Sequence, residues 1–95
     1  MIRNVVLMKF KAGTTPEQVQ RLVNELQGMQ IPGMLNVSTG GDAGLRDGNM
    51  DLGLVIDLED EEAYKIYDQD AEHNRIRRDL VQPILERIER IQYRV

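Results

Sequence analysis

The sequence predicts an α+β fold, with a four-stranded antiparallel sheet in the ferredoxin-like βαββαβ order and helices on one face. Three observations predict it: segments with period-two alternation, segments with apolar residues at helical spacing, and the order of these segments. A strand is followed by a helix, two strands, a second helical region and a last strand. The length of 95 residues suits one domain, over residues 1–95.

The first predicted strand runs from Ile2 to Lys11 and is rich in Val, Leu, Ile and Phe. Period-two alternation divides it into two faces, Ile2/Asn4/Val6/Met8/Phe10 and Arg3/Val5/Leu7/Lys9/Lys11. Both faces carry apolar residues in the middle. We therefore expect a central strand that is covered on both sides.

The first helix has a well-marked start. Thr15 is the expected N-cap, Pro16 occupies the first helical position and Gln18 completes a capping box. An apolar stripe at helical spacing follows, formed by Val19, Leu22, Val23, Leu26 and Met29. Gly28 and the Pro32–Gly33 pair end this segment.

Two strands and a second helical region occupy the middle of the chain. Residues 34–39 alternate as a short strand, residues 40–49 form a glycine-rich connection, and residues 50–58 resume the strand pattern. Asp60 is a helix N-cap followed by acids in the first turn, where the helix dipole favours them. That helix is expected to end near Gln69.

A further helical pattern begins near Glu72, and its stripe is formed by His73, Ile76, Leu80 and Ile84. Pro83 lies inside the stripe, so the helix is expected to kink or end there. Residues 91–95 alternate as the last strand.

The sheet face opposite the helices carries apolar side chains. Val5, Leu7 and Val55 would form an exposed apolar patch in a monomer. Pairing two sheets face to face buries such a patch, so we expect a symmetric homodimer.

Composition excludes several functional classes. A net charge of −4 argues against a nucleic-acid partner, and the C-terminal arginines alternate with acids as a salt-bridged surface does. There is no Cys, and therefore no disulfide, thiolate zinc site or Cys nucleophile. No apolar run reaches the ~20 residues of a membrane span, and no signal-peptide pattern opens the chain. We expect a cytoplasmic protein without a membrane partner.

Several segments together resemble the stress-responsive A/B-barrel (Dabb) family: IRNVVLMKFK, the helix after it, the IPGM turn, DLGLVIDLEDEEAYKIY and DAEHNRIRRDLVQPILERIERIQYRV. The resemblance covers nearly the whole chain and implies a dimeric α+β barrel. It extends, more distantly, to the plant polyketide cyclase olivetolic acid cyclase, a cofactor-free branch of the family. This chain has Asn4 and Leu52 where that cyclase has further histidines.

The resemblance implies a catalytic pair, His73 and Tyr67, within YDQDAEH. His73 would remove a proton next to a carbonyl, and Tyr67 would donate a hydrogen bond to the imidazole or the developing enolate oxygen. From the residues alone, His73 is the natural general base because its ordinary pKa is close to neutral. The alternative interpretation is a core histidine that is hydrogen-bonded to a neighbour.

We expect a small apolar pocket for an apolar or polyketide-like ligand, with no cofactor and no metal site. The residues expected to line it are Asn4, Val6, Met8, Leu22, Val23, Leu26, Leu52, Leu54 and Ile56. Two alternatives to a cyclase-like proton-transfer activity remain open. One is a non-catalytic, stress-associated small-molecule-binding protein. The other is a cofactor-free monooxygenase, which an aromatic content of 4% disfavours.

Overall fold

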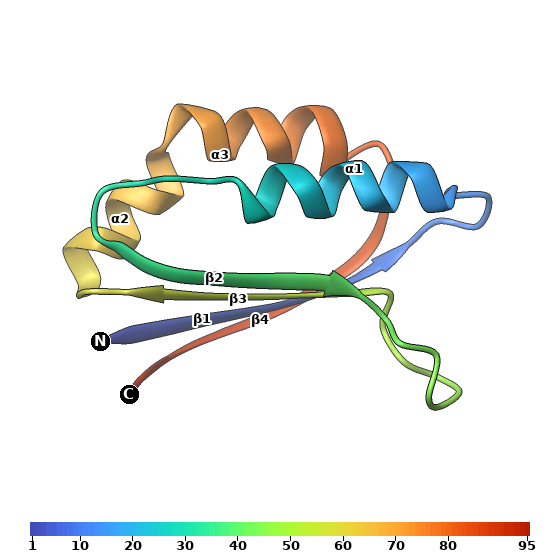
Figure 1. Ribbon diagram of the computed structural model, residues 1–95, viewed down its shortest axis with the longest axis horizontal. Coiled ribbons are helices and arrows are strands. Elements are labelled where there is room, and N and C mark those ends of the chain that lie inside the picture. The colour runs from blue at the N-terminus through green and yellow to red at the C-terminus, as the bar shows by residue number, and fades with distance from the viewer.

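The computed structural model describes residues 1–95 and contains the predicted elements in the predicted order (Figure 1). The strands are β1 (Ile2–Phe10), β2 (Met34–Gly41), β3 (Leu52–Leu58) and β4 (Leu85–Arg94). The helices are α1 (Pro16–Gln27), α2 (Glu61–Gln69), α3 (Ala71–Ile76) and the π-helical η1 (Arg77–Val81), which continues α3. The expected βαββαβ order is therefore confirmed.

All neighbouring strands of the sheet are antiparallel, and their order is β2-β3-β1-β4. The helices lie on one face of the sheet, and its other face carries no helix (Figure 1). This is the ferredoxin-like arrangement. β1 is central, as its two apolar faces predict, and β4 is an edge strand.

The start of α1 has the predicted capping box. The backbone N–H of Gln18 donates to the Thr15 Oγ1 over 3.2 Å, and the backbone N–H of Thr15 donates to the Gln18 Oε1 over 2.8 Å. Leu22 and Leu26 of the apolar stripe are the buried residues of α1. Met29 is also buried, but it lies beyond the end of the helix.

The helix-facing side of β1 is buried along its whole length, from Ile2 to Phe10, whereas Leu7 on the opposite side is 42% exposed. Other apolar side chains share the uncovered face, because cross-strand partners point to the same side of a sheet. Val5 pairs with both Val55 and Ile91, and Ile91 is 58% exposed. The predicted apolar patch is thus present, and it extends onto β4.

The prediction of the C-terminal strand was six residues too short, because β4 begins at Leu85 and not at residue 91. Pro83 has no N–H to continue a helix, and the helical segment accordingly ends at Val81. Ile84 is buried as expected but lies outside the helix, and its carbonyl accepts from the Lys11 N–H over 2.7 Å. A strand at the edge of a sheet tolerates charged side chains such as Arg and Glu. The many charged residues of this segment concealed the strand in the sequence.

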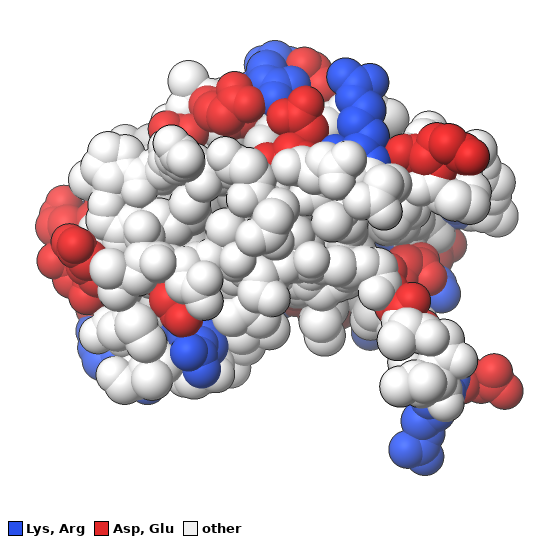
Figure 2. Space-filling view, in the orientation of Figure 1, with Lys and Arg blue, Asp and Glu red and all other residues white.

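Charged side chains form local pairs on the surface. Arg75 donates to Glu72, Arg78 to Asp79 and Arg87 to Glu89, over 2.7–3.0 Å, as expected for a salt-bridged surface. Figure 2 shows acidic and basic groups side by side over the helices, without a continuous basic track on the face in view. No helix is long and apolar enough to cross a membrane.

Candidate functional site

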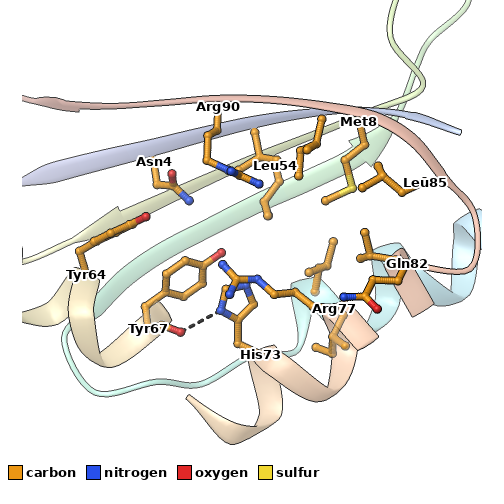
Figure 3. Close-up of a pocket in the computed structure, with 15 residues that line it drawn as sticks. Asn4, Met8, Leu54, Tyr64, Tyr67, His73, Arg77, Gln82, Leu85 and Arg90 are labelled. Atoms are coloured by element: carbon orange, nitrogen blue, oxygen red, sulfur yellow. Dashed lines mark hydrogen bonds between the residues drawn. The ribbon is translucent and has the colours of Figure 1, made fainter. Parts of the chain in front are cut away.

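A cavity of about 170 Å³ lies between the sheet and the helical layer, over β1 and β4 (Figure 3). Ten of its fifteen lining residues are hydrophobic, and its polar groups come from a few side chains only. The lining consists of Asn4, Val6, Met8, Leu26, Leu54, Tyr64, Tyr67, His73, Ile76, Arg77, Val81, Gln82, Leu85, Ile88 and Arg90. Such an apolar cavity with a small set of polar groups is typical of a small-molecule site.

The junction between α2 and α3 positions His73. Asp70 ends α2 and is also the N-cap of α3, and its Oδ2 accepts from the backbone N–H of His73 over 3.0 Å. The last carbonyls of a helix have no partner within the helix. One of them, that of Tyr67, accepts from the backbone N–H of the C-cap residue Asp70 over 3.3 Å and also lies 2.8 Å from the His73 Nδ1. The N-cap of α3 therefore holds the backbone of His73, and the end of α2 holds its ring.

This hydrogen bond determines the tautomer of His73. A carbonyl oxygen only accepts, so Nδ1 carries the proton and donates a hydrogen bond to the Tyr67 carbonyl. In the neutral ring Nε2 is then unprotonated and has a free lone pair. We expected the Tyr67 hydroxyl to donate to the imidazole or to a developing enolate oxygen. The imidazole is bonded to the Tyr67 backbone instead, which leaves the hydroxyl for the second role.

The two rings are stacked. Their centroids are 3.9 Å apart with an interplanar angle of 21°, and only 3% of His73 and 2% of Tyr67 are exposed. The Tyr67 hydroxyl has no hydrogen bond within the protein, yet no buried polar side-chain atom is sealed away without a partner. The hydroxyl therefore reaches open space, on the cavity side of the ring as Figure 3 shows.

Burial controls the ionisation of both residues. It lowers the pKa of His73, against the opposing effect of the hydrogen bond to the Tyr67 carbonyl, and the positive charge of Arg77 lowers it further. Burial also raises the pKa of Tyr67 to about 12. At neutral pH the site thus contains a neutral imidazole, which can accept a proton, beside a neutral phenol, which can donate a hydrogen bond.

Five of the nine residues expected to line a pocket do so, namely Asn4, Val6, Met8, Leu26 and Leu54. Leu22, Val23, Leu52 and Ile56 do not line it. Because the cavity lies over β1 and β4, β3 contributes only Leu54 and α1 only Leu26. Leu22, Leu52 and Ile56 are packed in the closed core, and Val23 is half-buried at its edge.

Asn4 contributes a polar group from the sheet. Its Oδ1 accepts from the Gln92 Nε2 over 2.7 Å, and its Nδ2 has no partner within the protein. In Figure 3 the nitrogen end of this amide faces the cavity. The Nδ2 is therefore a free donor opposite the His73–Tyr67 pair.

Sequence reasoning missed four polar lining residues, Tyr64, Arg77, Gln82 and Arg90. Helical spacing could have indicated Arg77, which follows His73 by four residues and so shares its face. Arg90 pairs with Val6 across the sheet and points to the same side. It could have been found only if the last strand had been extended to Leu85. No cluster of three or more His, Asp or Glu side chains is arranged to hold a metal ion.

Comparisons with solved structures agree with this fold. A dimeric ferredoxin-like protein of unknown function from Thermobifida fusca YX is 28% identical, with a TM-score of 0.92 over 99% of this chain and 90% of that one. A Dabb family protein from Mesorhizobium loti is 20% identical, with a TM-score of 0.81 over 99% and 95% of the two chains. The hydroxynitrile lyase of Passiflora edulis is 15% identical, with a TM-score of 0.81 over 97% and 90%.

No curated protein matches the chain. The family model described as the stress responsive A/B barrel domain (Dabb) matches residues 2–95, nearly the whole length. The match agrees with the segments that suggested this family and with the ferredoxin-like sheet. The chain therefore belongs to the Dabb family.

Proposed function

We propose that this Dabb protein removes a proton from the carbon next to the carbonyl group of a small, mainly apolar compound, as a cofactor-free cyclase or lyase does. His73 is the general base and Tyr67 the hydrogen-bond donor. The observation that carries the proposal is the bond from His73 Nδ1 to the Tyr67 carbonyl, which leaves Nε2 unprotonated in a buried site.

The proposed step is simple. His73 Nε2 accepts a proton from the carbon next to a carbonyl, the electron pair of that C–H bond forms a carbon–carbon double bond, and the π pair of the C=O bond moves to the oxygen to give an enolate. The Tyr67 hydroxyl, whose pKa is about 12, donates a hydrogen bond to this oxygen. The lowered pKa of His73 keeps the imidazole unprotonated at neutral pH, the form that a base requires.

The cavity limits the size of the ligand. An engineered cavity of about 150 Å³ in another protein accepts benzene, and the cavity here measures about 170 Å³. A single six-membered ring with one substituent, or a chain folded to that size, would fill it. We propose that such a ligand contacts Val6, Met8, Leu26 and Leu54 through its apolar part, and Asn4 through a polar group.

The fold is compatible with carbon–carbon chemistry in at least one other protein. The similar structure from Passiflora edulis is a hydroxynitrile lyase, and that activity belongs to that protein. At 15% identity the likeness concerns the fold alone. It supports the proposal only in that this architecture can hold a site for such a reaction.

We also propose that two copies of the chain pair through the uncovered sheet face. Solved structures of the same fold are described as dimeric, including the Thermobifida fusca protein. The face carries Val5, Leu7, Val55, Ile91 and Tyr93, a set that a monomer would leave in contact with water. The cavity lies on the opposite side of the sheet, so pairing leaves its mouth accessible.

The test is solvent deuterium exchange at the α-carbon of ethyl acetoacetate, a neutral β-keto ester, followed by NMR. We expect the wild-type protein to accelerate exchange above the buffer rate. His73→Ala should remove about 100-fold or more of that acceleration, the usual contribution of a general base. Tyr67→Phe retains the ring stack and should also slow exchange, because it removes only the hydroxyl.

Ligand binding without chemistry is the second candidate function, which the apolar cavity itself favours. It predicts that ethyl acetoacetate perturbs the signals of cavity residues in both the wild type and His73→Ala. Equal exchange rates in these two proteins would exclude the proton-transfer proposal and leave binding as the function.

A further inference from the structure

Arg90 is the one basic side chain of the cavity that no carboxylate neutralises. It lies on β4 opposite Val6, and its side chain extends toward the cavity (Figure 3). It forms no ion pair, in contrast to its neighbour Arg87, which is paired with Glu89 on the other face of the strand. Asp and Glu are absent from the cavity lining. In a chain of net charge −4, this cavity therefore has a positively charged lining.

Arg77, the second basic residue of the lining, differs from Arg90. Its Nη2 donates to the Asp68 Oδ1 over 3.0 Å, and its Nη1 donates to the Asn74 Oδ1 over 3.1 Å. Its charge is thus largely compensated by Asp68 and its donors are engaged. Arg77 can therefore position the part of the helix that carries His73. Arg90, in contrast, retains all its N–H donors for a ligand.

Asn4 adds a donor beside Arg90. The register pairs Asn4 with Gln92 and Val6 with Arg90, so Asn4 and Arg90 are diagonal neighbours on the helix-facing side of the sheet. The Gln92 amide holds the Asn4 Oδ1, which leaves the Asn4 Nδ2 free to donate. A guanidinium and an amide N–H₂ on one wall are donors suited to the two oxygens of a carboxylate.

From this arrangement we infer that the cavity takes a ligand with a carboxylate, which Arg90 and Asn4 bind at the sheet wall while the mainly apolar remainder, which includes the reacting carbonyl, extends toward His73 and Tyr67. The inference rests on the proposed function, since it defines the substrate class of the same cavity. Burial raises the pKa of Tyr67, and the charge of Arg90 acts on it in the opposite direction, as expected if the guanidinium lies near the hydroxyl.

The experiment compares benzoate with benzamide, two ring compounds of nearly equal size, of which only benzoate is charged. Each is titrated into the full chain up to about 10 mM, with binding followed by NMR. We expect benzoate to bind about tenfold more tightly than benzamide at low salt, because charge-assisted hydrogen bonds are the stronger ones. Added salt should weaken the binding of benzoate alone, since Arg90 is exposed to water.

Three variants test whether Arg90 causes the preference for benzoate over benzamide. Arg90→Gln should bring the two affinities to the same value, and Arg90→Lys should retain part of the preference. Arg21→Gln is the matched control, because Arg21 is exposed, forms no ion pair and lies outside the cavity. It should leave the preference unchanged.

Equal affinities in the wild type, failure of both compounds to bind, or a preference that survives Arg90→Gln would each overturn the inference. These outcomes are separate from the test of the proposed function, which measures exchange of the neutral ethyl acetoacetate. A protein that prefers benzoate through Arg90 but does not accelerate exchange retains the carboxylate site and loses the proposed proton transfer.

Discussion

The His73 Nδ1–H donates a hydrogen bond to the backbone carbonyl of Tyr67 over 2.8 Å, across the junction between α2 and α3. The same two residues stack their rings, with 3.9 Å between the centroids. The contact joins the end of one helix to the start of the next and directs the basic nitrogen of the imidazole away from the helix end. A carbonyl at a helix terminus, which also accepts from the backbone N–H of Asp70, thereby sets the chemical state of the proposed base.

The first prediction concerns the ionisation of His73. Because burial lowers its pKa, we expect titration below the value of about 6.5 for a free imidazole. The neutral ring should be protonated at Nδ1. Nitrogen-15 NMR measures both properties, and this chain has a single His, so the signals need no assignment. A pKa near 6.5 or the opposite tautomer would contradict the observed site.

The same shift makes stability depend on pH. A lowered pKa means that the folded protein binds the proton less readily than the unfolded chain does. The contribution of neutral His73 is complete above about pH 6.5 and is lost as the pH falls through the lowered value. Urea unfolding between about pH 7.5 and pH 5.5 should show this decrease in the wild type, and a flatter profile in His73→Gln.

The second prediction concerns Asp70, which caps α3 at the residue that places His73. Asp70→Ala should lower the free energy of unfolding by about 1 kcal/mol, the usual effect of losing an N-cap. It should also slow the deuterium exchange proposed above, because the His73 backbone loses its anchor. Asp70→Asn keeps a capping oxygen and is the control. Equal stabilities of the two variants, measured in urea, would argue against the cap.

The third prediction concerns the turn between α1 and β2, where Gly33 has a φ of +83°. A Cβ at this position would lie 2.6 Å from the Cβ of Ala63 in α2, so alanine would force the turn and the helix apart. Gly13 is the matched control, with a φ of +88° and no atom within 4 Å of an added Cβ. Gly33→Ala should cost about 1–3 kcal/mol more than Gly13→Ala in urea unfolding, as expected for overpacking. Similar costs would mean that backbone strain alone accounts for both.

The fourth prediction concerns the proposed pairing of two chains. Ile91 is 58% exposed on the uncovered sheet face, and Ile66 is 46% exposed on α2. Ile91→Asp should place a charge in the interface and yield monomers, whereas Ile66→Asp should leave the dimer intact. Sedimentation analysis measures the mass of each protein. A wild-type protein that sediments as one chain, or a dimer that persists in Ile91→Asp, would exclude pairing through this face.

Local chemistry made much of the fold predictable. The capping box of Thr15 and Gln18 acts within a single turn, and alternation along β1 directly separates its buried side from its uncovered side. Such signals depend on neighbours in sequence, so they can be identified without a structure. The order of the elements followed from them.

The start of β4 could not be identified in this way. The segment after Pro83 places Glu–Arg pairs between Leu85, Ile88 and Ile91. This spacing suits an exposed helix as well as an edge strand, and only pairing with β1 distinguishes the two. The error concealed Arg90, whose position in the cavity depends on its register with Val6. Residues distant in sequence decide that register, so no local pattern could indicate it.

The sequence by itself determined the order of the elements and the helix starts, and its resemblance to the Dabb family indicated His73 and Tyr67, on which the proposal depends. Tertiary structure alone decided where the open space lies. Leu22 and Leu26 share one stripe, yet only Leu26 reaches the cavity, which opens over β1 and β4. The physical reason is that a cavity is the volume left between packed layers. It depends on how helices and strands meet, whereas hydrophobic periodicity specifies only which face is buried.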